Sequence, residues 1–262
     1  MPTETILVDR AEGVVTITLN RPERKNAGNG LMWQELLDTL GEIWRRRDDR
    51  VVVVTGAGGA FCSGADIGDP AGVSGDPGDP HVVRMRFFGR VMLALHELPK
   101  PTIAKIRGVA AGAGMSLALN CDLTVASDNA RFSEIFAKRG LSLDGGSSWL
   151  LPRLVGLHKA KELAYFADML SAQEAFDYGL LNRVVPDGEL DAFVEDWARR
   201  LAAGPPLALA MTKNLLDNGT AVTLAQALED EARCQTVNFG TADTGEAMRA
   251  FAEKRPPRFE GR

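Results

Sequence analysis

The stretch GVAAGAGMS, residues 108–116, decides the architecture of this chain together with FCSGADI at residues 61–67. Each stretch follows a β-like run, at 102–106 and at 51–55 respectively, and each leads toward a predicted helix. Both are poor in bulky side chains and rich in free backbone N–H groups. Two such turns can direct two amide N–H donors at one carbonyl oxygen, which is the arrangement of an oxyanion hole.

Glycine-rich turns between strands and helices are common, because glycine tolerates positive φ and close packing. A single such turn is therefore expected to be structural only. The pair is more specific, since motifs elsewhere in the chain accompany it. These motifs are Asn20-Arg21-Pro22, Asn26-Ala27, Asn120-Cys121-Asp122, Arg139-Gly140-Leu141, Ser148-Trp149-Leu150-Leu151-Pro152-Arg153 and the segments 175–184 and 251–254.

On these residues the sequence resembles the crotonase superfamily, the enoyl-CoA hydratases and isomerases, almost from end to end. The resemblance implies an α/β fold of the ClpP/crotonase type, with a spiral core of repeated ββα units and a C-terminal helical trimerisation region. It also implies that coenzyme A thioesters are the substrates and that no prosthetic group is bound. The expected assembly is a homotrimer, or a hexamer built as a dimer of trimers.

The hydrophobic pattern by itself predicts strand–helix alternation that gives way to helices after about residue 155. Strands are expected at 5–9, 14–19, 51–55, 102–106 and 122–126, with helices at 31–47 and 82–98. This order suggests βαβ-type crossovers. Further helices are expected at 158–167, 172–177, 190–203, 205–217, 223–236 and 245–254. We expect residues 1–200 to form the α/β core with the acyl-CoA site, and residues 201–262 a C-terminal helical oligomerisation region.

Three local patterns give further predictions. The run at 51–55 is continuously apolar, as in a strand whose two faces are both buried. The loop at 68–80 is rich in Gly, Pro and Asp and is expected to be mobile. The helix at 31–47 is expected to bury one stripe, formed by Trp33, Leu36, Leu37, Leu40, Ile43 and Trp44.

Composition excludes several classes of protein. The 262 residues are 45% hydrophobic and 25% charged, as in an ordinary globular protein. The net charge of -5, without a basic stripe, argues against nucleic acid as a partner. Three cysteines lack CxxC spacing, which fits a reducing cytosol, and three scattered histidines predict no metal site. We therefore expect a cytoplasmic protein that has no signal peptide and does not act at a membrane.

The resemblance assigns the two oxyanion donors to the backbone N–H groups of Ala65 and Ala113. A bulky side chain at either position would block a thioester, and alanine at both positions leaves room for it. The neighbouring Gly64, Gly112 and Gly114 are expected to support these turns by allowing the chain to bend tightly.

The resemblance also directs the CoA chain past residues 24–27 and 65–67. Arg24 and Lys25 suit the CoA phosphates by charge, although basic surface residues are often only solvated. Phe251 and Lys254 match a C-terminal pair that reaches CoA in the family, often from a neighbouring subunit. The expected CoA-binding residues are Arg24, Lys25, Ala27, Ala65, Asp66, Ile67, Phe251 and Lys254.

Hydratases of this family carry two glutamates that hold and activate a water molecule. At the matching positions this chain has Ser116 and Phe136, and neither side chain can shuttle a proton at a suitable pKa. Glu134 lies two positions too early, and on a regular element its side chain would point elsewhere. Hydration with the usual pair of acids is therefore not expected.

Asp144 suggests a different reaction. It lies in GLSLDGGSSW, residues 140–149, which resembles the segment where Δ3,Δ2-enoyl-CoA isomerases and phenylacetate-pathway ring isomerases carry a single acid. One base can remove a proton from C2 of a 3-enoyl thioester and return it at C4, while the oxyanion hole holds the dienolate. Burial of the carboxyl would raise its pKa toward that role. The expected catalytic residues are Asp144, Ala65 and Ala113, and the acyl pocket is expected to include Ser116, Phe136 and Trp149.

Other interpretations of the same residues stay open. Asp144 precedes Gly-Gly-Ser-Ser, so it is also a good candidate for an Asx turn or for the cap of a helix that begins near Ser147. The rival activities are enoyl-CoA hydration and nucleophilic attack by Asp144, as in dehalogenases of this fold. A CoA-binding protein with little catalysis is a further alternative.

Overall fold

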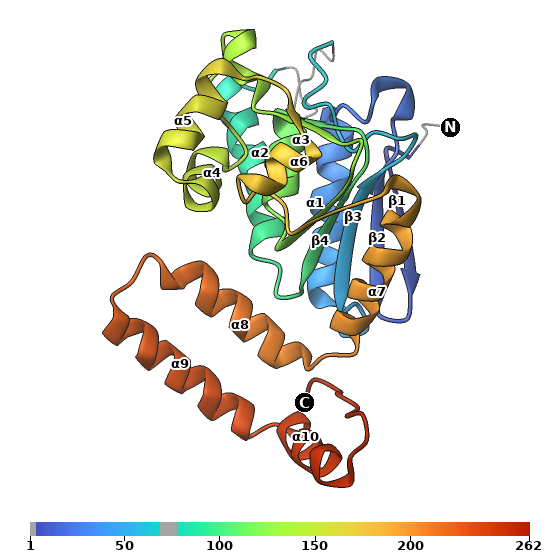
Figure 1. The fold of residues 1–262 in the computed structure, drawn as a ribbon, viewed down its shortest axis with the longest axis vertical. Helices are drawn as coiled ribbons and strands as arrows, with labels where there is room; N and C mark the ends of the chain where they lie inside the picture. The colour runs from blue at the N-terminus through green and yellow to red at the C-terminus, as the bar shows by residue number, and fades with distance from the viewer. Residues whose placement is uncertain (1–3, 69–77) are drawn as a thin grey trace.

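A six-stranded sheet forms the centre of the computed structural model, which describes residues 4–68 and 78–262 (Figure 1). The strand order is β1-β2-β3-β4-β6-β9. The strands are β1 (Ile6–Ala11), β2 (Val14–Leu19), β3 (Val51–Gly56), β4 (Thr102–Ile106), β6 (Leu123–Ser127) and β9 (Arg183–Val185). Strands β1 and β2 form an antiparallel hairpin, and every other pair in this sheet is parallel. The crossovers predicted from the sequence pattern are thereby confirmed.

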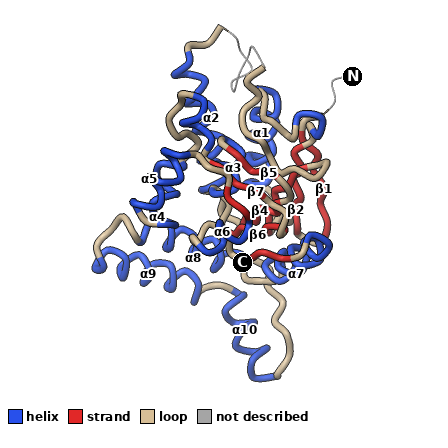
Figure 2. The backbone as a smooth tube through the Cα atoms, turned by 45° about the horizontal axis from the view of Figure 1, so that its top comes forward, coloured by secondary structure: helices blue, strands red, loops and turns tan. Residues whose placement is uncertain are grey.

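Helices cover both faces of this sheet (Figure 2). On one face, Val52 and Val54 share a buried cluster with side chains of α1 (Gly30–Arg45) and α2 (His81–His96). On the other face, Val51 and Val53 share a second cluster with α7 (Leu190–Ala202). Every residue from 51 to 55 is buried, so the prediction of a strand with two buried faces is confirmed.

The expected apolar stripe of α1 is confirmed in part. Trp33, Leu36, Leu40 and Ile43 are buried, and Leu37 is partly buried against them. Trp44 is 53% exposed, so its assignment to the core was wrong. The reason lies in its place along the helix. Trp44 is in the last turn, where it lines a cavity between the core and a C-terminal helix instead of packing under the sheet.

A second, three-stranded sheet carries the region of the predicted site. It consists of β5 (Val109–Ala111), β7 (Arg131–Ser133) and β8 (Leu170–Ser171), in that order. These strands have two or three residues each, too few to show a period in the sequence. The short elements around this sheet are η1 (Pro22–Arg24), α3 (Ala113–Leu119), η2 (Ile135–Arg139), α4 (Ser147–Val155), α5 (Leu157–Phe166), α6 (Ala172–Asp177) and η3 (Asp187–Glu189).

Three helices project from the core as a C-terminal arm (Figures 1 and 2). The arm consists of α8 (Pro206–Gly219), α9 (Leu224–Phe239) and α10 (Ala242–Glu253). Neither α8 nor α9 contains a buried residue. An ion pair of 2.9 Å between Lys213 Nζ and Asp122 Oδ1 ties α8 to the core. The arm is therefore a helical unit that the single chain leaves largely uncovered.

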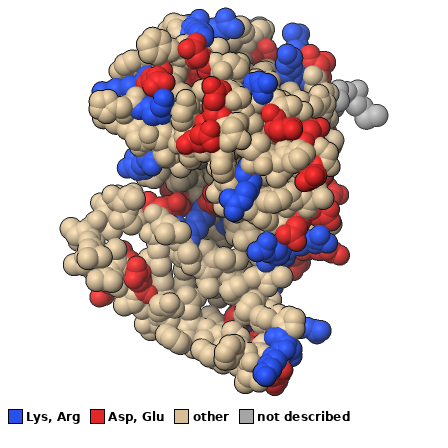
Figure 3. Space-filling model, viewed as in Figure 1, with Lys and Arg blue, Asp and Glu red and all other residues tan. Residues whose placement is uncertain are grey.

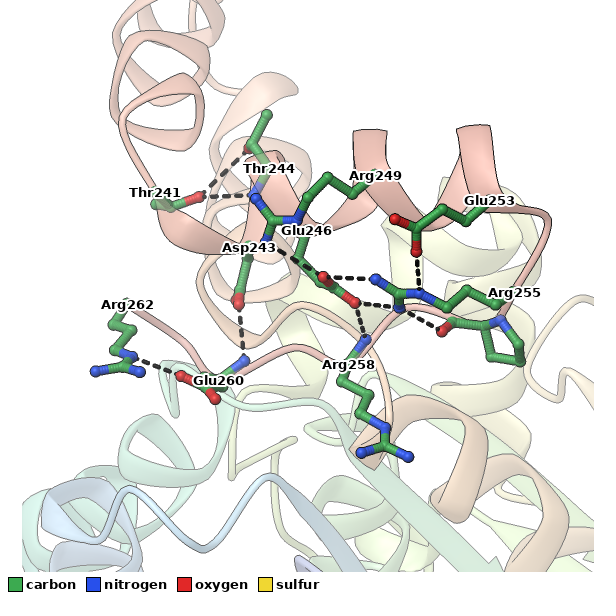
Figure 4. Close-up of polar contacts among 11 residues, drawn as sticks. Thr241, Asp243, Thr244, Glu246, Arg249, Glu253, Arg255, Arg258, Glu260 and Arg262 are labelled. Atoms are coloured by element: carbon green, nitrogen blue, oxygen red, sulfur yellow. Dashed lines mark hydrogen bonds and ion pairs between the residues drawn. The ribbon is translucent and has the colours of Figure 1, made fainter.

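The last residues of the chain fold back from the arm to the core. Arg50 donates to the carbonyl oxygens of Ala202, at 3.2 Å, and of Phe259, at 2.8 Å. The carboxylate of Asp243 accepts from the N–H group of Glu260 at 2.7 Å (Figure 4). It also accepts from the N–H group of Gly261 at 2.9 Å. These bonds fix the C-terminal tail, residues 254–262, against both the arm and the core.

Most of the loop predicted at 68–80 lies outside the described residues, since the structure describes only Gly68 and 78–80 of it. Across residues 4–68 and 78–262, no helix combines the length and the apolar character needed to cross a membrane. The same ranges contain no group of three His, Cys, Asp or Glu side chains suited to a metal ion.

Candidate active site

The two glycine-rich turns lie directly against each other. Cys62 pairs with Ala110 in a parallel bridge, with its N–H donating to Val109 O and its carbonyl accepting from Ala111 N–H, both at 3.0 Å. A Cβ atom added to Gly114 would lie only 2.2 Å from Cys62 O. Glycine at this position is thus what allows α3 to approach the first turn so closely.

Both N–H groups expected to form the oxyanion hole are left without a backbone acceptor in the described part of the chain. The N–H of Gly28 donates to Gly64 O at 2.8 Å, and the carbonyl of Gly28 accepts from Asp66 N–H at 2.9 Å. Gly28 therefore binds the residues before and after Ala65 and leaves the N–H of Ala65 itself unused. Ala113 is the first residue of α3, where an N–H has no partner within the helix. These two donors therefore belong to adjoining turns.

Gly112 shapes the second turn. Its φ of 52° and ψ of -125° lie in a region that side chains disfavour, and its N–H donates to Ser133 O at 2.9 Å. A Cβ atom added to Gly112 would lie 3.8 Å from Cζ of Phe136. The buried phenyl ring, expected in the acyl pocket, is therefore next to the turn that carries Ala113.

The loop that carries Asp144 is fastened to α3. The Ser116 hydroxyl donates to Asp144 O at 3.1 Å and lies 2.9 Å from the Ser147 hydroxyl. The buried Asn120 side chain donates to Gly145 O at 2.7 Å and to Ser116 O at 2.8 Å. Asn120 belongs to a motif that the sequence displayed, but it received no role there. Its role in the structure is to hold the loop of Asp144 beside α3.

The Asp144 carboxyl makes no hydrogen bond or ion pair with another described residue. Its Oδ1 atom is buried and makes no hydrogen bond, and burial raises its pKa to about 6. Helix α4 begins after Gly146, and no side chain caps its N-terminus. Only the backbone carbonyl of Asp144 serves the turn, accepting from Ser147 N–H at 3.1 Å. Helix capping therefore does not account for this side chain.

Glu134 lies close enough to Asp144 for the charge of Asp144 to act on it, and it does not lie on a regular element, which was the premise for expecting its side chain to point elsewhere. It is 1% exposed, and neither carboxylate oxygen has a hydrogen-bond partner among residues 4–68 and 78–262. Burial raises its pKa to about 7, and the charge of Asp144 contributes to the rise while the nearby Ser147 hydroxyl opposes it. The segment is not a regular element here. Strand β7 ends at Ser133 and η2 begins at Ile135, so period-two reasoning does not apply to Glu134.

The two segments expected along the CoA chain lie side by side. Ser63 N–H donates to Lys25 O at 3.0 Å, and Gly28 pairs with Ala65. Arg21, which was not assigned a role from the sequence, binds Asp66 through a 2.8 Å ion pair and also donates to Ala27 O. Although partial burial opposes it, the Arg21 contact lowers the pKa of Asp66 below its usual value. Arg24, Lys25 and Ile67 are exposed.

Two groups of predicted residues lie apart from these turns. Phe251, which is 87% exposed, and Lys254 belong to the end of α10, away from the core in both ribbon views. Trp149 stacks under Arg153 and lines a cavity of about 800 Å³ between the core and α8, a hollow visible in Figure 3. Gly145 and Gly146 line the same cavity, so the cavity adjoins the loop that carries Asp144.

Comparison with known proteins agrees with this geometry. A sequence model described as enoyl-CoA hydratase/isomerase matches residues 9–262. The chain belongs to the enoyl-CoA hydratase/isomerase family. The match includes both glycine-rich turns and the Asp144 loop, so the crotonase resemblance read from the motifs is confirmed.

Family members with different names match the whole chain. A 1,2-epoxyphenylacetyl-CoA isomerase from Escherichia coli K12 is 38% identical over 99% of both chains. A probable enoyl-CoA hydratase from Rhodobacter capsulatus is 39% identical over the full length of both. The crystal structure of an enoyl-CoA hydratase from Bacillus anthracis superposes with a TM-score of 0.93 at 35% identity, covering 98% of this chain and 100% of that one. The expected crotonase fold is therefore confirmed, and this member of the enoyl-CoA hydratase/isomerase family is an acyl-CoA enzyme.

Proposed function

We propose that this enzyme moves the double bond of an enoyl-CoA thioester, using Asp144 as its only proton-transferring group. The observation that carries the proposal is the Asp144 carboxyl, which is partly buried, has no partner for Oδ1 and lies on a loop fastened to α3. A pKa of about 6 leaves most of this carboxyl ionised at neutral pH while keeping it basic enough to accept a proton from carbon.

The reaction follows from the two turns and the one acid. Ionised Asp144 removes a proton from C2 of a 3-enoyl thioester, and the C2–H electron pair moves into a dienolate. The N–H groups of Ala65 and Ala113 bind the thioester oxygen, where the negative charge gathers. Protonated Asp144 then returns the proton at C4, which leaves the 2-enoyl thioester. The same carboxyl is regenerated, so no water and no second acid are consumed.

Hydration fits the described residues less well. Where family hydratases carry their two glutamates, this chain has a buried phenyl ring at Phe136 and a fully buried Ser116. The Ser116 hydroxyl is already bonded to the carbonyl of Asp144 and lies beside the hydroxyl of Ser147. The isomerase from E. coli supports the proposal by its name, whereas the probable hydratase from R. capsulatus makes hydration the rival to be tested.

Incubation in D₂O tests the proposal. The purified protein is given a trans-3-enoyl-CoA or, separately, a trans-2-enoyl-CoA, and the products are read by mass spectrometry. We expect interconversion of the two esters with deuterium uptake and without addition of water. Rapid formation of 3-hydroxyacyl-CoA would instead identify a hydratase, and halide release from a halogenated acyl-CoA would identify Asp144 as a nucleophile.

A pair of variants assigns the chemistry to Asp144. Asp144→Asn should lower kcat by about 10²–10⁴-fold, the usual range for loss of an acid–base group, while CoA-thioester binding persists. Asp168→Asn is the matched control, because this aspartate is exposed and only pairs with Lys138. Unchanged activity in Asp144→Asn would contradict the mechanism. Binding without turnover in the wild-type protein would favour a CoA-binding role.

The same proposal includes the binding of CoA and the assembly. Residues 1–200 would supply the acyl-CoA site, with Arg24, Lys25 and the paired segments along the CoA chain. Residues 201–262 would pack against other copies in a homotrimer or a dimer of trimers. Phe251 and Lys254 would then reach the CoA of a neighbouring copy, which fits their position at the far end of the arm.

A further inference from the structure

Glu134 is the most unusual polar side chain in the described structure. It is 1% exposed, yet both of its carboxylate oxygens lack a hydrogen-bond partner. Burial of an ionised carboxylate without a partner is very costly, because the protein interior replaces water poorly around a charge. A group in this position must either hold a proton or serve a purpose that offsets the cost.

The neighbours of Glu134 connect it with the predicted active site. Ser147 is close enough to affect its pKa, and the Ser147 hydroxyl lies 2.9 Å from that of Ser116. Ser116 in turn donates to the carbonyl of Asp144, whose charge acts on Glu134. The Ser116 and Ser147 hydroxyls therefore connect the backbone of the Asp144 loop with the surroundings of Glu134. Both Glu134 and Asp144 Oδ1 are unpartnered, so neither is neutralised by a salt bridge.

The charged groups on the surrounding elements are engaged elsewhere or exposed. Lys138 of η2 pairs with Asp168 at 2.8 Å, and Lys159 of α5 pairs with Glu162 at 2.8 Å. Arg139 of η2 is exposed, and Arg153 of α4 stacks over the ring of Trp149. Asp144 is the one charged side chain among the described residues that acts on Glu134.

We propose that Glu134 is a positioning residue for Asp144: it is protonated in the active form of the enzyme, so that the pair of carboxyls carries a single negative charge. Two carboxylates in one buried region repel each other, and the second ionisation is therefore opposed. A neutral Glu134 leaves the charge on Asp144, where the base is needed. An ionised Glu134 would add a second anion close to the dienolate and oppose its formation.

This proposal rests on the isomerase function, so its first test does not use activity. In the Asp144→Asn variant, Glu134 is the remaining acid of the pair. An infrared titration of that protein should show a protonated carboxylic acid that persists above the pH at which exposed carboxyls ionise. It should disappear at a lower pH than in the wild type, because the Asp144 charge that helps to raise the pKa of Glu134 is gone. The Asp144→Asn, Glu134→Gln double variant should lack this band. Absence of the band in Asp144→Asn would overturn the proposal whether or not the enzyme is an isomerase.

The second test uses the dependence of kcat/KM on pH. The wild-type profile should be bell-shaped, rising as Asp144 ionises and falling about tenfold per pH unit once Glu134 ionises. Glu134→Gln keeps the shape of the side chain but cannot ionise, so its profile should rise to a plateau and lose the alkaline fall. A merely structural role would lower the rate equally at every pH. An alkaline fall that persists in Glu134→Gln would refute the proposal.

If the isomerase assignment itself fails, Asp144→Asn will keep full activity or no isomerisation will be seen in D₂O. In that case the infrared band still reports whether Glu134 holds a proton. The two failures can therefore be told apart. Circular dichroism of each variant shows whether it is folded before either test is interpreted.

Discussion

The α/β core buries many of its side chains within the single chain, whereas the C-terminal arm leaves nearly all of its side chains at least partly exposed. In the core, β3 is buried on both faces, and α3 buries all of its residues from Ala113 to Leu119. In the arm, α8 and α9 bury no residue, although α9 carries exposed apolar side chains such as Leu224 and Leu228. The core is thus complete within one chain. The arm has the composition of a structure that gains its stability from another surface.

This difference predicts whether a substitution will change the stability of the fold or the association of the chain. A change in the tightly packed turns should damage the fold and the site together, because neighbouring backbone atoms leave no room to adjust. A change on the arm should leave the folded core intact and alter association instead. Four substitutions, taken from the largest expected change in stability to the smallest, sharpen or break this contrast.

Gly114→Ala should have the largest effect. The added Cβ would lie 2.2 Å from Cys62 O, a backbone atom that can move only with the whole turn. We expect the free energy of unfolding to fall by about 3 kcal/mol or more, measured by chemical denaturation. Gly41→Ala in α1 is the control, because only the end of the Arg45 side chain lies within reach of its Cβ. That variant should be stabilised by about 1 kcal/mol. Similar free energies of unfolding for the two variants would contradict the claim that the packed turns cannot adjust to an added side chain.

Glu134→Gln should change how stability depends on pH. The pKa of Glu134 is about 7 in the folded protein and 4.5 as a reference, so the folded wild-type chain holds a proton that the unfolded chain releases. Its free energy of unfolding therefore falls as pH rises from about 4.5 to 7, and the variant lacks this loss. Relative to wild type, the variant should gain about 2 to 3 kcal/mol across that window. A difference that is constant with pH in urea titrations would be inconsistent with a buried, proton-holding carboxyl.

Asp243→Ala should loosen the tail without affecting the core. The substitution removes the acceptor for the N–H groups of Glu260 and Gly261. Hydrogen bonds to a charged group each contribute about 1.5 to 3 kcal/mol, and solvent near the tail reduces this, so we expect a local loss of about 2 kcal/mol. Hydrogen exchange should become faster across 254–262 and stay unchanged in β3. Faster exchange in β3 would show that the tail supports the core directly.

Leu228→Lys should have the smallest effect on the stability of the core, within about 0.5 kcal/mol, because the side chain is 55% exposed on α9. Its effect should appear in the mass of the assembly, which light scattering after size exclusion would show to decrease. Leu40→Ala is the matched change in the core, where the leucine is 1% exposed, and should cost about 2 to 5 kcal/mol. An unchanged mass in Leu228→Lys would remove this face of α9 from the proposed oligomer interface.

The elements that were predicted well are those whose burial is decided within the core. Strands β2 and β4 have the predicted bounds, and β3 differs by one residue at its end. Their apolar residues are buried in the core or packed against it, so the hydrophobic pattern alone is enough to predict the bounds of these strands. Trp44 was misassigned because its surroundings depend on α8, which is distant in sequence. A local stripe cannot show where a helix extends past the sheet that it covers.

The site was predictable where backbone conformation determines it and less so where irregular turns do. The glycine-rich turns could be recognised from residue type, because their close approach requires glycine. Asp144 was singled out by the family resemblance, and its catalytic role is part of the proposal. Glu134 was set aside on the assumption of a regular element, whereas it lies in a one-residue break between β7 and η2, and such breaks leave no period in the sequence. Arg21 and Asn120 belong to motifs that were visible, but the backbone atoms to which they bind become neighbours only after folding.

Arg50 has a consequence for how the arm can move. One guanidinium group holds Ala202 at the end of α7 and Phe259 in the tail, so the chain leaves the core and returns to it at the same place. In topological terms the arm is a closed loop whose two ends meet at Arg50, and not a free tail; the Lys213–Asp122 ion pair is a second tie to the core. Closing a loop at its base lowers the entropy of the chain within it while leaving its orientation adjustable. Any swing of the arm that keeps the Arg50 contacts at its base would therefore have to break the Lys213–Asp122 ion pair.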